Sequence, residues 1–172
     1  TPVAVTTYPI VVGGGGPGTV GVPYTKGGNG GTSSGFSLTA AGGGGGGAYQ
    51  TGTTGYPGGS GGGASAGLNG SYPNAGGTGN TPPVSPPQGN NGGAGSGNPN
   101  FQGIQGGGAV AVGSTCNADN GAPNSISGSA IYYCTGGTQS PSISPRANSG
   151  FGGKPQGVVG CSGIVIIRYQ FQ

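Results

Sequence analysis

GGSGGGASAGLNG, residues 58–70, is the stretch of this sequence that decides the fold. It places Gly58, Gly61, Ala64, Gly67 and Gly70 at a strict spacing of three. A spacing of three matches neither the period of an α-helix, about 3.6 residues, nor the alternation of a β-strand. It matches the polyproline II conformation, which has three residues per turn and a rise of ~3.1 Å per residue. The stretch therefore predicts extended glycine helices of the polyglycine II type.

The same spacing recurs elsewhere in the chain. It is found in GNNGGAG, residues 89–95, and in GVVGCSG, residues 157–163, whereas the unbroken runs 13–16 and 42–47 satisfy any period. These segments predict which residues form the structural frame of the bundle. Two isoleucines near the carboxyl end, at the start of an apolar block, are added to the glycines of this set. The predicted frame positions are Gly42, Gly47, Gly58, Gly61, Gly67, Gly70, Gly157, Gly160, Gly163, Ile164 and Ile166.

A polyproline II helix has no internal hydrogen bonds, so every amide and carbonyl must find a partner outside it. Collagen meets this need with an unbroken triplet repeat, but here the longest strict repeat covers about four triplets. The remaining solutions are a bundle of short glycine segments bonded to one another and a flexible Gly/Ser-type linker. A bundle is favoured because the chain also has aromatic anchors and an apolar terminal block, which a linker does not need.

Composition excludes most classes of enzyme. Of 172 residues, 49 are Gly and 15 Pro, while Lys and Arg number 4, Asp and Glu 1, and His 0. General acid–base catalysis, a nucleophile with its base, and zinc or calcium sites all need residue types that this chain lacks or has once. We therefore expect no enzymatic activity and no cofactor. The scattered cations predict no nucleic-acid contact, and no apolar segment is long enough to insert into a membrane.

Four segments have strand-like composition. Residues 34–40 alternate polar and apolar side chains, and residues 8–12, 129–134 and 163–171 are β-branched or aromatic. The Pro/Asn-rich residues 80–91 and residues 139–154 are predicted to be exposed loops. The predicted fold is a polyglycine II bundle, or glycine-rich sandwich, with a few short β-strands and essentially no α-helix, in one domain spanning residues 1–172.

Three cysteines leave two interpretations open. Cys116 and Cys134 enclose a segment without another thiol, and a bridge there would contribute ~3 kcal/mol by chain entropy. The alternative is three free thiols, and Cys161 has no separate partner in the chain in either case.

Five blocks, in this order, resemble the glycine-rich domain common in bacteriophage tail fibre proteins, and the resemblance covers nearly the whole chain. The terminal block is the most specific of them. The blocks are YPIVVGGGG at 8–16, SLTAAGGGGGG at 37–47, QGNNGGAG at 88–95, SISGSAIYY at 125–133 and SGIVIIRY at 162–169.

By that resemblance the chain is the C-terminal part of a longer fibre protein and begins inside the domain. It is similar to tip adhesins of T-even-type phages, in which a polyglycine II sandwich presents variable loops to the host. The resemblance implies a receptor-binding adhesin of the virion tail fibre, located on the virion or extracellularly. Its implied partners are a bacterial surface protein or glycan, other tail fibre chains, and further copies of itself as a trimer or filament.

Aromatic residues at the ends of glycine segments are the candidate receptor contacts, because rigid aromatic side chains give contact area at low entropy cost. Each could instead pack on the flank of the bundle. Three further residues form a second, more polar candidate patch. The candidates are Tyr49, Tyr56, Tyr72 and Phe101, and then Arg146, Phe151 and Lys154.

The alternative function is a structural subunit of an extracellular or virion filament or coat. Such a subunit would assemble through hydrogen bonds between glycine-rich backbones of neighbouring chains, since unpaired edges invite growth. An adhesin predicts a discrete particle that binds host cells, whereas a coat or filament subunit predicts polymers in the absence of any host.

Overall fold

The structure is a computed structural model of the 172-residue chain. It describes residues 7–20, 25–48, 53–65, 74–95, 104–114, 121–137, 147–153 and 158–168. Over these residues the chain forms no helix, and so none that could cross a membrane.

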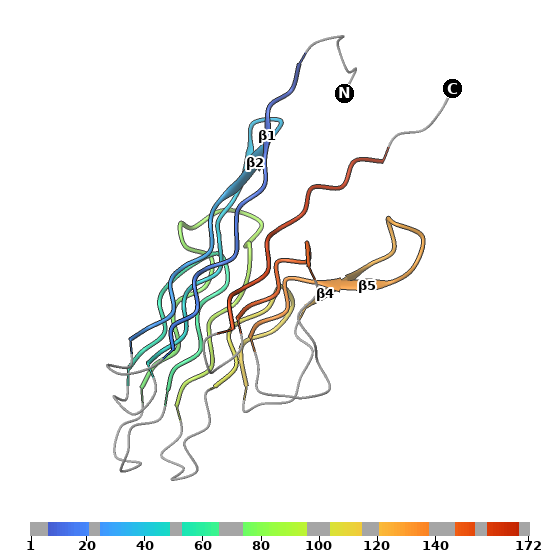
Figure 1. Ribbon diagram of the computed structural model, residues 1–172. Helices are drawn as coiled ribbons and strands as arrows, with labels where there is room; N and C mark the ends of the chain where they lie inside the picture. Colours follow the sequence, from blue (N-terminus) through green and yellow to red (C-terminus); the bar gives the residue numbers. More distant parts are fainter. Residues whose placement is uncertain are drawn as a thin grey trace.

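Two small antiparallel sheets flank a set of extended glycine segments (Figure 1). The first sheet joins β1, β2 and β3 in chain order, and the second pairs β4 with β5. The strands are β1 Ile10–Val11, β2 Ser33–Gly35, β3 Leu38–Ala40, β4 Ala122–Asn124 and β5 Ile131–Tyr133.

The predicted strand at residues 34–40 is wrong, because this segment is a hairpin. Gly35 pairs with Leu38, and the two residues between them have positive φ, 52° at Phe36 and 64° at Ser37. Two successive positive φ values make the two-residue type I′ connection of a tight hairpin. Phe36 adopts this conformation while its ring lies 4.9 Å from that of Tyr8, centroid to centroid, so aromatic contact offsets part of the backbone strain.

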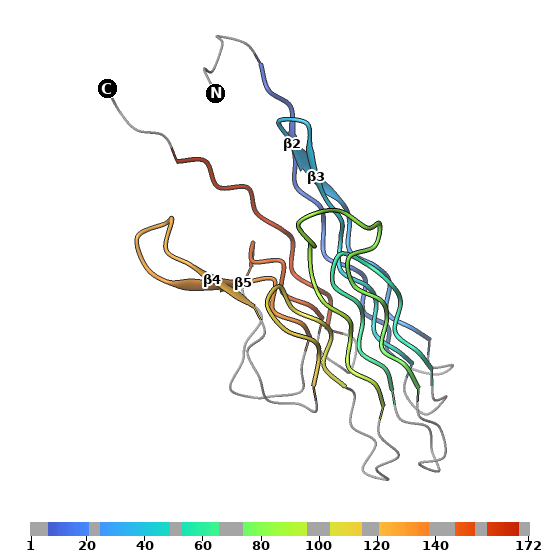
Figure 2. The ribbon, with the colours of Figure 1, turned by 180° about the vertical axis from the view of Figure 1, so that it is seen from behind.

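The glycine segments run side by side as extended threads, as Figures 1 and 2 show from opposite sides. Their hydrogen bonds repeat every third residue on both partners. Gly28 and Gly31 donate to the carbonyls of Pro17 and Gly14, and Gly44 and Gly47 donate to those of Ser60 and Gly63. A period of three at donor and acceptor alike is the expected pattern for polyglycine II helices bonded laterally. The predicted fold class is confirmed.

The thread of residues 59–65 lies at the centre of the most densely bonded region. Its amides donate to threads 53–58 and 89–95, through Gly62 to Tyr56 and through Gly61 to Asn90. Its carbonyls accept from three further threads, 42–47, 74–80 and 104–108. This single thread therefore bonds to five others. The predicted spacing of Gly61 and Ala64 corresponds to one face of the thread, because both donate to thread 89–95.

Close packing of backbones explains why so many of these residues are glycine. A Cβ built on Gly42, Gly47, Gly58 or Gly61 would overlap backbone atoms of a neighbouring thread. Gly160 and Gly163 have more room, with nearest atoms at 3.3 and 3.1 Å, and bond to the carbonyls of Gly16 and Gly13. The other predicted frame glycines, Gly67, Gly70 and Gly157, lie outside the described residues.

The interior of the bundle is polar. The buried hydrophobic side chains of the described residues are Ala48, Ala64 and Phe151, and Gln105 and Thr135 are fully buried beside them. A core with so little hydrocarbon contributes little by the hydrophobic effect. Backbone hydrogen bonds, at about 0.5–1.5 kcal/mol each, therefore provide the main stabilisation of the bundle.

Two predicted segments differ from the structure near the carboxyl end. The described part of the predicted strand 163–171, residues 163–168, forms no strand, and Ile164 is 43% exposed while Ile166 is half-buried. Beyond Gly163, no described backbone group forms a hydrogen bond with this segment. Its β-branched residues favour a strand, but no neighbouring strand is present among the described residues to pair with it. Within the predicted exposed loop 139–154, Ser149 and Phe151 are buried, because residues 149–153 form a thread.

Candidate contact surface

Of the predicted contact residues, Tyr56 lies within the described residues and has an exposed side chain, with an exposed fraction of 43%. The ammonium of Lys26 lies 4.5 Å from the centroid of its ring, a cation–π arrangement. The same Lys26 Nζ donates to Thr54 Oγ1 over 3.2 Å, and Asn29 Nδ2 donates to the Pro57 carbonyl over 3.2 Å. We call these five residues, Lys26, Asn29, Thr54, Tyr56 and Pro57, the Tyr56 patch.

The two segments that supply the Tyr56 patch are both hydrogen-bonded to the same residue, Gly45, of thread 42–47. The Tyr56 amide donates to the Gly45 carbonyl over 2.8 Å, and Asn29 Oδ1 accepts from the Gly45 amide over 2.8 Å. Gly45 thus joins the segments that supply Lys26 and Tyr56. The patch offers a cation, an aromatic face and amide and hydroxyl groups on a backbone held by hydrogen bonds, which suits recognition of a polar or carbohydrate surface.

Phe151 does not belong to an accessible surface. Its side chain is 5% exposed, and its carbonyl accepts from the Cys161 amide. We therefore leave Phe151 out of the proposed contact surface. The five remaining candidates, Tyr49, Tyr72, Phe101, Arg146 and Lys154, lie outside the described residues.

The predicted exposed loop 80–91 is exposed at residues 82–87, whereas Gly89 is buried and begins the thread 89–95. Its Pro-rich part, residues 81–88, is fixed from within by one side chain. Asn80 Oδ1 accepts from the amides of Val84 and Gln88, each over 3.2 Å, and Asn80 Nδ2 donates to the Val84 carbonyl. Asn80 itself has φ 48°, a conformation that Asn tolerates better than most residues. Val84 at the tip is 42% exposed. The sequence located this loop but gave no sign that Asn80 organises it.

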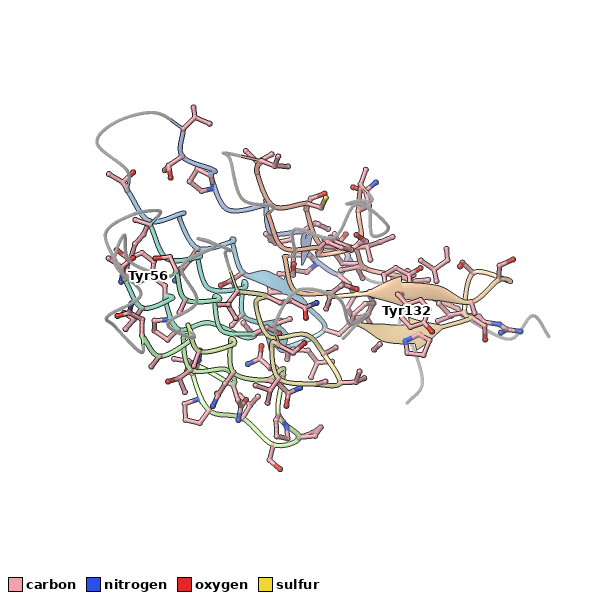
Figure 3. The ribbon with its side chains drawn as sticks, turned by 90° about the horizontal axis from the view of Figure 1, so that it is seen from below. Tyr56 and Tyr132 are labelled. Atoms are coloured by element: carbon pink, nitrogen blue, oxygen red, sulfur yellow. The ribbon has the colours of Figure 1, made fainter. Side chains whose placement is uncertain are left out.

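The β4–β5 hairpin projects sideways from the bundle (Figure 1) and carries Tyr132, which is 45% exposed. Figure 3, seen from below, places Tyr132 and Tyr56 on opposite sides of the molecule. One ligand of modest size cannot contact both. Strand β4 was not predicted, because Pro123 at its centre argues against a strand except at a sheet edge.

Cys134 is a free cysteine in the structure, so the pairing with Cys116 considered from the sequence is not formed. The residue as a whole is exposed, but its Sγ lies 3.3 Å from the position that a Cβ on Gly150 would occupy. Burial raises the pKa of the Cys134 thiol from its ordinary value, and the pKa of Cys161, also free, shifts in the same direction for the same reason.

Alkylation by iodoacetamide is expected to modify Cys134 without prior reduction. Because the thiolate is the reactive form and the raised pKa lowers its population in the folded protein, labelling should be slower than in urea and should accelerate as the pH rises. Peptide mass spectrometry with and without dithiothreitol measures this. Labelling of Cys134 only after reduction would show that the thiol is bridged.

Among the described residues, no three His, Cys, Asp or Glu side chains gather at one place where they could hold a metal ion. A protein-family model described as a glycine-rich domain matches residues 1–170. Neither the curated proteins nor the solved structures contain a match to this chain.

Proposed function

This chain belongs to the glycine-rich domain family, and from that premise we propose that it is a receptor-binding adhesin domain of a bacteriophage tail fibre. In this proposal the glycine threads are a rigid scaffold, and the side chains on its surface contact a protein or glycan of the bacterial surface. The observation that carries the proposal is the exposed Tyr56 ring with Lys26 above it, built on hydrogen-bonded threads.

The scaffold supports this role for a physical reason. Its threads are held through backbone groups, so residues between them can change without loss of the frame, and exposed loops on a rigid frame are where recognition residues concentrate. A patch that is already ordered loses little entropy on binding. The Pro-rich loop, ordered by Asn80, supplies a second rigid surface of the same kind.

The exposed apolar residues near the chain ends fit attachment to other fibre chains. Val11 and Leu38, in the β1–β3 sheet, are 54% and 74% exposed, and Ile167, near the other end of the chain, is 57% exposed. Figure 1 shows that this sheet and the last described residues of the chain extend toward the same end of the bundle. In the proposal these residues pack against neighbouring fibre chains or further copies, which leaves the flanks free for the host.

The test is binding of the purified, fluorescently labelled chain to a panel of intact bacterial strains, measured by flow cytometry. We expect a subset of strains to bind it, and Tyr56→Ala to weaken that binding at least ~tenfold, as for an interface hot spot. Tyr132→Ala, a matched loss of an exposed tyrosine on the opposite side, should bind like the unaltered chain.

Two results would count against the adhesin. If no strain binds and the chain polymerises with rising concentration in light scattering, the structural coat or filament is favoured instead. If Tyr56→Ala and Tyr132→Ala bind equally well, the Tyr56 patch is not the contact surface.

A further inference from the structure

Eight threads close into a ring around a cavity of about 1250 Å³. Each thread is hydrogen-bonded to the next, and the last bonds back to the first through Gly160 and the carbonyl of Gly16. The cavity is lined by all eight and, among the described residues, by no charged side chain. In order around the ring the threads are 13–17, 27–31, 42–47, 59–65, 104–108, 134–137, 149–153 and 158–163.

The central thread, residues 59–65, presents unpaired amides to this cavity. In a threefold helix, amides three residues apart point in one direction, so each thread has three donor directions. On this thread, Gly61 and Ala64 donate in one direction and Gly62 and Ser65 in the second. The third direction belongs to Ser60 and Gly63, which line the cavity and whose amides donate to no described residue.

An unpaired amide at this position is costly. Gly63 is buried, and a buried donor without a partner costs about 1–3 kcal/mol. Gly43 and Gly46, on the neighbouring thread of the ring, also line the cavity with amides that donate to no described residue. The cavity thus offers donors at intervals of three residues along two adjacent walls, the pattern that an incoming thread would use.

A second observation, independent of the hydrogen bonds, comes from the glycines that line the cavity. A Cβ on Gly27, Gly30, Gly43, Gly46 or Gly106 would meet no atom nearer than 3.4 Å, so packing within the described chain does not require glycine there. Glycine nevertheless loses more conformational entropy on folding than any other residue. Glycine at these five positions of the walls is explained if another backbone lies against them.

We propose that the cavity binds an extended glycine-rich polypeptide segment supplied by a different protein chain. Its carbonyls would accept from Ser60, Gly63, Gly43 and Gly46, and its own amides and carbonyls would pair with the remaining walls. Glycine or other small residues are required where the segment lies against the glycine stretches of the walls, because these stretches present only backbone. The glycine runs of the described residues are already threads of this bundle, so a folded second copy has none of them to give.

The length of the segment follows from the ring. Six residues of a polyproline II helix span ~19 Å, and the ring threads 42–47 and 59–65 have about this length. A suitable probe is therefore Lys-Lys-Gly-Gly-Ser-Gly-Gly-Gly-Ala-Ser, which carries the sequence of residues 58–65 behind two solubilising lysines. The matched control peptide has valine at every third position, where side chains would strike the walls.

The experiment measures binding of the fluorescent probe to the whole chain by anisotropy, and amide exchange of the chain by NMR with and without probe. We expect saturable binding, slower exchange at Ser60 and Gly63, and at least ~tenfold weaker binding of the valine peptide, the loss of about 1.4 kcal/mol. Gly46→Leu, which fills the cavity from one wall, should reduce probe binding to the same degree. Ala75→Leu, on an exposed thread outside the cavity, should not.

Gly106→Val fills the cavity from another wall and should reduce probe binding in the same way, so it replaces Gly46→Leu if that variant fails to fold. The proposal is overturned by unchanged exchange at Ser60 and Gly63 under excess probe, or by equal binding of the valine peptide. Protection of these two amides that develops with protein concentration, without probe, would assign the cavity to a second copy and also overturn it.

Discussion

Replacement of Gly44 by alanine is expected to destabilise the protein by at least about 3 kcal/mol, whereas replacement of the adjacent Gly43 should cost less than about 1 kcal/mol. A Cβ on Gly44 would overlap the carbonyl of Tyr56, and backbone cannot move aside as a flexible side chain does. At Gly43 the nearest atom, the Ser60 oxygen, is 3.8 Å away. Urea denaturation of the two variants measures the difference.

The same comparison extends over the run 42–47. Overlap with neighbouring backbone is expected at Gly42, Gly45 and Gly47, while Gly46, with its nearest atom at 3.9 Å, should behave like Gly43. Alanine scanning of six identical residues should thus give a stability profile with a period of three. A flat profile would contradict threefold packing.

Gly27→Pro is expected to cost at least about 2 kcal/mol, because it removes the hydrogen bond from the Gly27 amide to the Gly46 carbonyl and leaves that carbonyl facing a proline ring. Proline otherwise suits the thread, since its φ of about −65° is close to the polyproline II value. The expected loss of stability at this site therefore comes from the missing N–H donor and not from an unfavourable backbone conformation. Thermal denaturation measures the effect.

Two variants control for the proline ring and the added Cβ. Gly27→Ala keeps the amide and has 3.5 Å of room, so it should retain most of the stability. Gly46→Pro removes an amide that bonds to no described residue, and it should cost less than Gly27→Pro. Equal losses for Gly27→Pro and Gly27→Ala would mean that the side chain, not the hydrogen bond, is responsible.

The period of the bundle could be predicted from the sequence, but its arrangement could not. The spacing of Gly58, Gly61 and Ala64 indicates threefold helices because a side chain is excluded from one face in three. The run 42–47 does not indicate which of its residues face a neighbouring backbone, since six identical residues do not distinguish Gly43 from Gly44. Without side chains, a thread also carries no information on which neighbours it will bond to, so the ring and its cavity had no signal in the sequence.

Local exceptions were hidden for other reasons. The hairpin within residues 33–40 depends on positive φ at Phe36 and Ser37, where the turn signal of Asn-Gly or Asp-Gly is absent. Phe151 follows Gly150, which has a positive φ of 65°, and its side chain is buried. An aromatic residue next to glycines therefore does not by itself indicate an exposed side chain. Exposure of Tyr56 agrees with its predicted place at the end of a glycine segment, although Gly45 and Lys26, which fix it, lie far from it in sequence.

The central claim is that backbone amides paired between threads hold this protein together. Site-resolved hydrogen exchange tests it most directly. The amides of Gly61, Gly62 and Ala64, bonded to Asn90, Tyr56 and Gly93, should exchange at least ~1000-fold more slowly than in an unstructured peptide. Exchange at these three sites as fast as in a free peptide would contradict the account.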